Sequence, residues 1–171
     1  MTKTLYLLRH AKSSRESPTS SDHDRQLAPR GRRASQHMAE HLRAQGIAPD
    51  IVLCSSASRT QETLELIRAG FSREVRVEIE PGLYGAGTGE LLERVRTVGR
   101  DVESVMLIGH NPGMQQLTVS LAGHGKRLDA VRGKFPTAAL ATLTFAGSWD
   151  ELAPKAAELV AFVRPRDLES D

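Results

Sequence analysis

The sequence predicts an α/β protein in which helices cover both faces of a mostly parallel sheet, a three-layer α/β/α sandwich. Short apolar runs, typical of strands buried on both faces, recur at residues 5–8, 50–54 and 105–108. Segments with helical spacing of apolar residues separate these runs, so strand and helix alternate along the chain. The length of 171 residues, with no internal repeat or linker, predicts one domain over residues 1–171.

The first predicted strand, at residues 5–8, is followed by a polar stretch and then by a helix. Residues 11–28 are rich in Ser, Asp, Pro and Arg, which predicts a long exposed loop of a kind that is often functional. Pro29 then opens a helix whose apolar stripe includes Met38, and Gly46 stops it. This strand, loop and helix form the first unit of the predicted sheet.

The next predicted strands are also connected by helices. The strand at residues 50–54 leads into residues 55–58, a serine-rich turn suited to capping a helix. Residues 75–79 alternate between apolar and charged side chains, which predicts a half-exposed strand. A helix over residues 91–98 then precedes the fully apolar strand at residues 105–108.

The last part of the chain contains two further predicted strands. Pro112 fits the first turn of the helix that follows the central apolar strand. A polar, glycine-rich connection over residues 123–133 separates that helix from strands at residues 138–145 and 159–163. These strands complete the predicted sheet.

Polar side chains stand at the predicted carboxyl ends of three strands, the edge where such sheets bind ligands. Arg9 and Arg59 carry guanidinium groups, which match phosphate oxygens in bidentate contacts. His10 and His110 carry imidazoles, which act as nucleophiles, acids or bases near neutral pH. Two helices are predicted to begin beside these clusters, and their free N–H groups favour an anion. Together these features predict an electropositive pocket of the size of a phosphoryl group.

Three motifs resemble those of the histidine phosphatase (phosphoglycerate mutase-like) superfamily. Residues 7–11, Leu-Leu-Arg-His-Ala, resemble its Arg-His-Gly signature with alanine in place of the glycine. Residues 55–63 look like the second motif, and residues 109–112, Gly-His-Asn-Pro, look like the third. The short length, together with residues 9–14 and 24–31, is similar to SixA-type phosphohistidine phosphatases in particular. The resemblance runs over nearly the whole chain and implies the histidine phosphatase fold.

The resemblance also implies a mechanism. His10 would attack phosphorus in line and form a phosphohistidine intermediate, which water hydrolyses, while Arg9, Arg59 and His110 hold the phosphoryl oxygens. No metal and no organic cofactor is implied. Because the nucleophile needs a free nitrogen lone pair, we predict that His10 Nδ1 donates to a backbone carbonyl and leaves Nε2 free.

The usual proton donor of the superfamily is missing from its two expected positions. Residues 81–88 contain no carboxylate where mutase-like members carry a glutamate, and Asn111 stands where acid-phosphatase-like members carry an aspartate. An imidazole leaving group, with a reference pKa of about 6.5, needs protonation less than an alkoxide does. The absence of this proton donor therefore favours phosphohistidine as the substrate. Candidates for a substitute acid are Asp22, His23, Asp24, Glu80 and Glu90.

The expected partner is a phosphorylated protein of the histidine phosphotransfer type. Two alternatives stay open: a phosphomonoesterase that acts on small phosphorylated molecules, and a phosphohistidine-binding module without catalysis. The intact pairs of arginine and histidine argue against the binding module. The residues considered for substrate binding are Lys12, Ser13, Asp24, Tyr84 and Asn111.

Some polar residues near the pocket have equally ordinary structural explanations. Asp24 is as readily a salt-bridge partner that orders its loop, and Tyr84 is as readily a packing residue. Arg30, Arg32 and Arg33 form a basic cluster, either a solvated helix face or a contact for an acidic substrate surface.

Composition argues against several classes of protein. The balance of 23 Lys and Arg against 21 Asp and Glu leaves a net charge of +2, which does not imply a nucleic-acid partner. No apolar run approaches the roughly 20 residues of a membrane span, and the N-terminus lacks a signal-peptide pattern, so we expect a cytoplasmic protein. The single cysteine, Cys54, excludes an internal disulfide.

Two other patterns are set aside. Residues 37–41 match the H-x-x-E-H zinc pattern, but no further ligand segment accompanies them. The glycine-rich residues 85–89 lack the lysine and the spacing of a nucleotide-binding loop. Neither pattern changes the expected phosphoryl chemistry.

Overall fold

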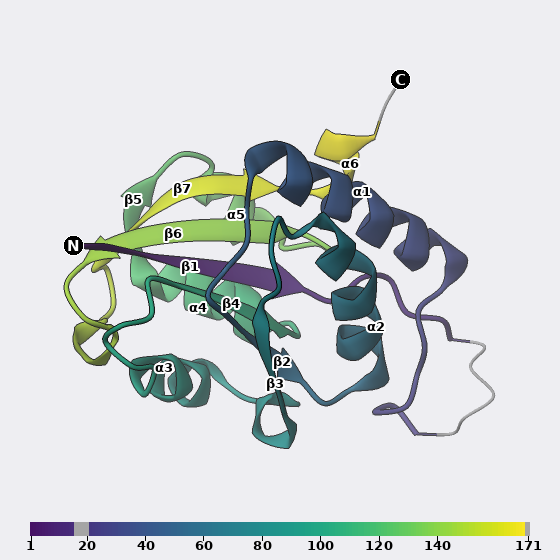
Figure 1. The fold of residues 1–171 in the computed structure, drawn as a ribbon, viewed down its shortest axis with the longest axis horizontal. Coiled ribbons are helices and arrows are strands. Elements are labelled where there is room, and N and C mark those ends of the chain that lie inside the picture. The colour runs from purple at the N-terminus through teal and green to yellow at the C-terminus, as the bar shows by residue number, and fades with distance from the viewer. Residues whose placement is uncertain (16–20, 170–171) are drawn as a thin grey trace.

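The computed structural model describes residues 1–15 and 21–169, which form a seven-stranded sheet with helices on both faces (Figure 1). The strands are β1 (Thr2–Arg9), β2 (Ile51–Ser55), β3 (Arg76–Glu80), β4 (Ser104–Gly109), β5 (Ala122–Gly125), β6 (Leu140–Ala146) and β7 (Ala157–Val163). The α-helices are α1 (Pro29–Gln45), α2 (Ser58–Ile67), α3 (Thr88–Arg96), α4 (Gly113–Leu121), α5 (Leu128–Gly133) and α6 (Pro165–Leu168), and short 3₁₀ helices occur at Arg68–Gly70, Pro81–Leu83 and Trp149–Glu151. Within the described ranges, no helix has both the length and the apolar character to cross a membrane.

The sheet has the order β3-β2-β4-β1-β6-β7-β5. Strands β1, β2, β3 and β4 run parallel to one another, and β6 runs antiparallel to β1 and β7. Helices α1, α2 and α6 lie on one face of the sheet, and α3, α4 and α5 lie on the other (Figure 1). The predicted α/β/α sandwich is therefore confirmed. Because the four parallel strands are neighbours, their carboxyl ends meet at one edge.

Alternating side chains of the central strands form two apolar cores. In β1, Leu5 and Leu7 pack toward α3, α4 and α5, whereas Leu8 packs toward α1 and α2. In β4, Leu107 and Ile108 divide between the two faces in the same way. Since successive side chains of a strand point to opposite faces, an unbroken apolar run needs a helical layer on each side. This is the physical reason why the apolar runs predict the layered fold.

Some local features differ from the prediction. Residues 123–133, which the sequence presents as a connection, contain most of β5 and all of α5. Strand β5 lies at the sheet edge and pairs with β7 through its backbone, so its polar residues show no apolar alternation. The residue that caps α2 is Ala57 rather than a serine, and α4 begins at Gly113 with Pro112 as its N-cap.

The segment after β1 is tied to the start of α1. Residues 16–20 of the predicted loop lie outside the described residues. Ser13 forms an antiparallel bridge with Leu27, and the Ala28 N–H donates to the Lys12 carbonyl oxygen at 2.9 Å. Ala11 and Leu27 are buried and anchor the two ends of this segment, whereas Ser21, Asp22 and Asp24 between them are exposed, as predicted for this loop.

Gly31 allows α1 to approach the chain just after β1. A Cβ at this position would lie 2.1 Å from the carbonyl oxygen of Lys12, which is far closer than real Cβ atoms come. Because the obstructing atom belongs to the backbone, a larger residue would force the helix and the segment apart. The position of the chain after His10 therefore depends on a glycine in the first turn of α1.

We expect Gly31→Ala to lower the free energy of unfolding by about 1–3 kcal/mol, because the added methyl group meets backbone atoms. Urea denaturation followed by circular dichroism measures the change. Gly82→Ala is the matched control, since no atom lies within 4 Å of a Cβ built there. Equal stability of the two variants would contradict the role given to Gly31.

Candidate active site

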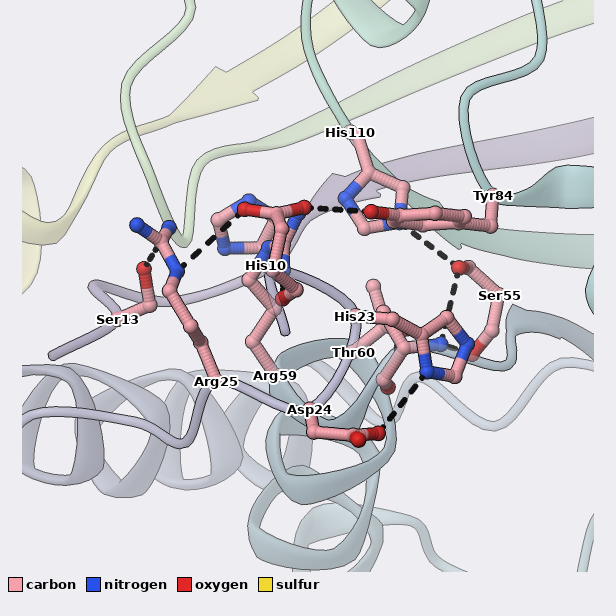
Figure 2. A network of polar contacts seen from close by, with 12 residues as sticks. His10, Ser13, His23, Asp24, Arg25, Ser55, Arg59, Thr60, Tyr84 and His110 are labelled. Carbon is pink, nitrogen blue, oxygen red and sulfur yellow. Dashed lines mark hydrogen bonds and ion pairs between the residues drawn. The ribbon is translucent and has the colours of Figure 1, made fainter. Parts of the chain in front are cut away.

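The carboxyl ends of the parallel strands bring the predicted pocket residues together, and Figure 2 shows His10, Arg59 and His110 among them. Arg9 is the last residue of β1, and His10 follows it. Arg59 lies in the first turn of α2, directly after β2, and His110 follows β4. The ring centroids of His10 and His110 are 5.2 Å apart. Segments far apart in the sequence thus form one polar cluster.

A hydrogen bond to the backbone fixes the orientation of the His10 ring. His10 is only 6% exposed, and its Nδ1 lies 2.7 Å from the Ala11 carbonyl oxygen. A carbonyl oxygen only accepts, so Nδ1 carries the proton of the neutral ring and donates it. The lone pair is then on Nε2. The prediction that Nδ1 bonds to a backbone carbonyl is confirmed.

Burial keeps both histidines of the cluster uncharged at neutral pH. Loss of solvent lowers the pKa of His10 to about 3, and the positive charges of Arg59 and Arg9 act in the same direction. Burial also lowers the pKa of His110 to about 4, and Arg59 is the next cause. An uncharged His10 keeps its lone pair available for attack on phosphorus.

His110 is held between Ser55 and Tyr84. Its Nε2 lies 2.8 Å from the hydroxyl oxygen of Ser55, the buried last residue of β2. The ring of Tyr84, which follows β3 after a short 3₁₀ helix, packs edge-on against His110 with a centroid distance of 5.5 Å. These contacts fix the second imidazole beside His10. Tyr84 therefore lies at the site and also packs against it, a position compatible with both substrate binding and packing.

The two arginines present hydrogen-bond donors that the protein does not use. Arg9 donates to the Phe135 carbonyl oxygen at 3.0 Å, and Arg59 donates to the Asp22 carbonyl oxygen at 2.7 Å. Among the described residues, four buried side-chain nitrogen atoms lack a hydrogen-bond partner, and three of them are Nε of Arg9, Nε of Arg59 and Nδ1 of His110. A buried polar group without a partner costs about 1–3 kcal/mol. The cluster is therefore arranged to receive a ligand rich in hydrogen-bond acceptors, such as a phosphoryl group.

Asp22 belongs to the cluster, although the sequence offers it only as a substitute acid. Its Oδ2 accepts from Arg59 at 3.1 Å and from the Tyr84 hydroxyl at 2.6 Å, and its Oδ1 lies 3.5 Å from Arg25 Nε. The hydrogen bond from Tyr84, followed by that from Arg59, lowers the pKa of Asp22, so its carboxylate is charged at neutral pH. No local signal marks this residue, because these two partners lie 37 and 62 positions away in the sequence.

Two other candidates from the same segment are engaged with neighbours. Ser13 Oγ accepts from Arg25 at 2.7 Å. Asp24 is exposed, and its Oδ1 lies 3.2 Å from Nδ1 of His23, which fits the alternative in which it orders the loop. Asp22, two positions earlier, is the aspartate that contacts the arginine of the cluster.

Asn111 and Lys12 lie at the border of the cluster. The side-chain amide of Asn111 donates to the Phe135 carbonyl oxygen at 2.9 Å and accepts from the Gln115 N–H at 3.3 Å. The amide nitrogen thus ties Asn111 to the connection from α5 to β6, and the amide oxygen accepts from the first turn of α4, so both ends of the side chain have partners within the protein. Lys12 is exposed and lines a neighbouring cavity together with Arg9.

Comparison with known proteins identifies relatives along most of the chain. Residues 5–136 match the model of the histidine phosphatase superfamily, branch 1. An uncharacterized protein of Mycobacterium tuberculosis is 37% identical over 163 residues, which cover 93% of this chain and all of that protein. A structure from Nakamurella multipartitia, provisionally named phosphohistidine phosphatase SixA, is 31% identical with a TM-score of 0.83, over 96% of this chain and 97% of that one. A structure from Agrobacterium tumefaciens with the same provisional name is 28% identical with a TM-score of 0.82, over 95% and 98%.

The chain therefore belongs to the histidine phosphatase superfamily. Within it the fold is of the SixA type, and the protein is a phosphatase. This confirms the family that the motifs at residues 7–11, 55–63 and 109–112 indicate.

The buried, uncharged state of His10 makes stability depend on pH. Its pKa is about 3 in the folded protein against 6.5 for a solvent-exposed histidine, so between these pH values the unfolded chain binds the extra proton. Above about pH 6.5 His10 is neutral in both states and does not affect the free energy of unfolding. As the pH falls from about 6.5 toward 3, protonation of the unfolded chain lowers this free energy progressively. Between pH 7 and pH 5 we expect the wild type to lose about 2 kcal/mol more of its unfolding free energy than His10→Asn does. Urea denaturation at the two pH values measures this, and an equal loss in both proteins would refute it.

The Asp22 carboxylate accepts from Arg59, which the sequence predicts to hold phosphoryl oxygens, so we expect it to compete with phosphate for this side chain. We expect Asp22→Asn to bind inorganic phosphate about three- to fivefold more tightly, the effect of removing one partly exposed ion pair. Isothermal titration calorimetry measures the affinity, and Asp24→Asn, from the same segment, should bind as the wild type does. Weaker phosphate binding by Asp22→Asn would show that Asp22 assists the anion instead of competing with it.

Proposed function

We propose that the protein hydrolyses phosphohistidine on a partner protein and that His10 carries the phosphoryl group between two chemical steps. The observation that carries this proposal is the uncharged His10, whose free Nε2 shares a cluster with the unpartnered Nε atoms of Arg9 and Arg59. Transfer of an anionic group needs a nucleophile and preorganised donors in one place. The SixA-type fold supports the same substrate class.

In the first step, His10 Nε2 attacks phosphorus in line, and the bond between phosphorus and the substrate imidazole breaks. Arg9 and Arg59 stabilise the negative charge on the phosphoryl oxygens, and Asp22 releases Arg59 as the phosphoryl group arrives. The departing imidazole takes a proton from solvent on its other ring nitrogen. His10 then holds the phosphoryl group on Nε2 and a proton on Nδ1, which still donates to the Ala11 carbonyl.

In the second step, water attacks phosphorus, the bond to His10 Nε2 breaks, and inorganic phosphate forms. Because Nδ1 has kept its proton, His10 leaves as a neutral imidazole and needs no proton from an acid. The hydrogen bond to Ala11 therefore serves both steps, since it exposes the lone pair for attack and preserves the ring proton for departure.

The protonation states of the cluster favour a nitrogen leaving group over an alkoxide. The lowered pKa of Asp22 keeps its carboxylate charged, and the pKa of about 4 keeps His110 neutral at neutral pH. Neither group then carries an acidic proton for a departing alkoxide. An imidazole, with a reference pKa of about 6.5, leaves more readily without such an acid. This supports phosphohistidine over sugar phosphates as the substrate.

A covalent phosphoenzyme on His10 is the direct test. We expect rapid quenching during turnover of a phosphohistidine peptide to trap acid-labile phosphate on the wild type. His10→Ala should carry none, and its kcat should fall by more than about a thousandfold because the nucleophile is gone. His124→Ala, which removes an exposed histidine outside the cluster, should match the wild type. Turnover by the wild type without trapped phosphate would refute the covalent step.

The same assay with 3-phosphoglycerate examines the leaving group. The wild-type kcat/KM for the phosphohistidine peptide should exceed that for 3-phosphoglycerate by at least about a hundredfold, the typical effect of a general acid that this alkoxide would lack. The opposite preference would identify a phosphomonoesterase for small molecules.

A further inference from the structure

A positively charged cavity borders the candidate active site. It has a volume of about 880 Å³ and lies between α1, the start of the segment after β1, the connection from α5 to β6, and the start of α6. Figure 1 shows α6 beside α1 on this side of the sheet. Seven of the lining residues are lysine or arginine and one is glutamate, although the net charge of the whole chain is only +2. We call this cavity the basic groove and define it by Arg9, Lys12, Arg30, Arg33, Lys134 and Arg166.

Most cations of the basic groove have no charged partner. Arginines outside it are typically paired: Arg32, on the same helix as Arg30 and Arg33, lies 2.9 Å from Glu62. Among the described residues, no carboxylate forms an ion pair with Lys12, Arg30, Arg33, Lys134 or Arg166. Like charges gathered in a concave surface without counter-charges raise the local potential and attract an anionic partner.

Arg9 connects the basic groove to the catalytic cluster. It lines the groove, and its guanidinium donates to the Phe135 carbonyl oxygen while Nε stays without a partner. The residues on both sides of Phe135 also line the groove. When a substrate has its phosphoryl group at His10, the adjoining parts of that substrate therefore face the groove.

The lining of the groove suits carboxylates better than a nucleotide. Among the described lining residues, none is Phe, Tyr or Trp, and the apolar ones are alanine and proline. Proteins that bind single-stranded nucleic acids stack the bases on aromatic side chains. Exposed arginine and lysine side chains from separate segments match several carboxylates spread over a protein surface.

We propose that the basic groove binds acidic side chains of the protein substrate beside its phosphohistidine. This proposal rests on the proposed function, because the phosphohistidine at His10 is what places the substrate over the groove. Attraction of this kind speeds the encounter and selects the partner, and added salt weakens it. The preferred substrates are therefore proteins with acidic residues around the modified histidine.

Two phosphohistidine peptides of equal length, flanked by glutamates in one and by glutamines in the other, test the proposal. We expect the wild-type kcat/KM to be about tenfold higher for the glutamate peptide, mainly through KM, because the groove acts on binding. The double variant Arg30→Glu/Arg33→Glu should lose this preference, while its turnover of the small substrate phosphoramidate stays at the wild-type level. Arg100→Glu/Lys126→Glu makes the same change of charge at exposed positions outside the groove and should keep the preference.

The possible outcomes distinguish a failure of the groove proposal from a failure of the proposed function. Equal turnover of the two peptides by the wild type overturns the groove proposal and leaves the proposed function standing. A preference that persists in Arg30→Glu/Arg33→Glu also overturns it, because the acidic contact then lies elsewhere. Turnover of 3-phosphoglycerate without turnover of either peptide overturns both proposals.

Binding of an unphosphorylated, fluorescently labelled glutamate peptide gives a second readout that does not depend on catalysis. Fluorescence anisotropy should show about a tenfold loss of affinity in Arg30→Glu/Arg33→Glu and none in the control variant. Tighter binding of a single-stranded RNA of equal charge, lost in the same double variant, would assign the groove to nucleic acid and overturn the proposal.

Discussion

The hydrogen bond from His10 Nδ1 to the Ala11 carbonyl decides which nitrogen of the ring keeps its lone pair. It joins neighbouring residues, so its geometry depends on the path of the backbone where β1 ends. That path is held by the hydrogen bond from the His10 N–H to the Gly109 carbonyl oxygen at 3.0 Å and by the close packing of Gly31 on the following segment. The nitrogen that keeps the lone pair is thus selected by strand pairing and helix packing, and a change that shifts either one would disturb this selection.

The sequence predicts the fold best at its continuous apolar runs, because such runs have to be buried on both sides. The apolar runs of β1, β2 and β4 predict a layered sheet, and the shared edge of parallel strands then brings Arg9, His10 and His110 together. The sequence predicts Asp22 only as a candidate acid and does not predict its contact with Arg59, because the two residues lie 37 positions apart and no local pattern links them. Strand β5 was not predicted for a related reason. An edge strand is stabilised by backbone pairing and need not show an alternation of apolar residues.

The cluster of Arg9, His10, Arg59 and His110 carries a cost in stability. Burial and the neighbouring charge of Arg59 lower the pKa of Arg9, and several buried nitrogen atoms lack partners. Asp22 offsets part of this cost, because its carboxylate neutralises charge at Arg59. A ligand that binds only the folded protein shifts the folding equilibrium toward it. An anion bound at the site would supply acceptors for these nitrogen atoms and should therefore stabilise the folded protein.

Phe135 lies between the cluster around His10 and the basic groove and contacts the cluster through its backbone. Its ring is buried against Phe162 with a centroid distance of 5.3 Å, and its carbonyl oxygen accepts from both Arg9 and Asn111. Arg9 thus donates to a main-chain oxygen of a residue whose own side chain is anchored in the core, while the residues on both sides of Phe135 line the groove. A change of charge at Lys134 would alter the groove but not the acceptor of Arg9, which is a backbone oxygen of Phe135. Under the two proposals, the residues that select a partner differ from those that hold the phosphoryl group, so evolution can change the first set and keep the second.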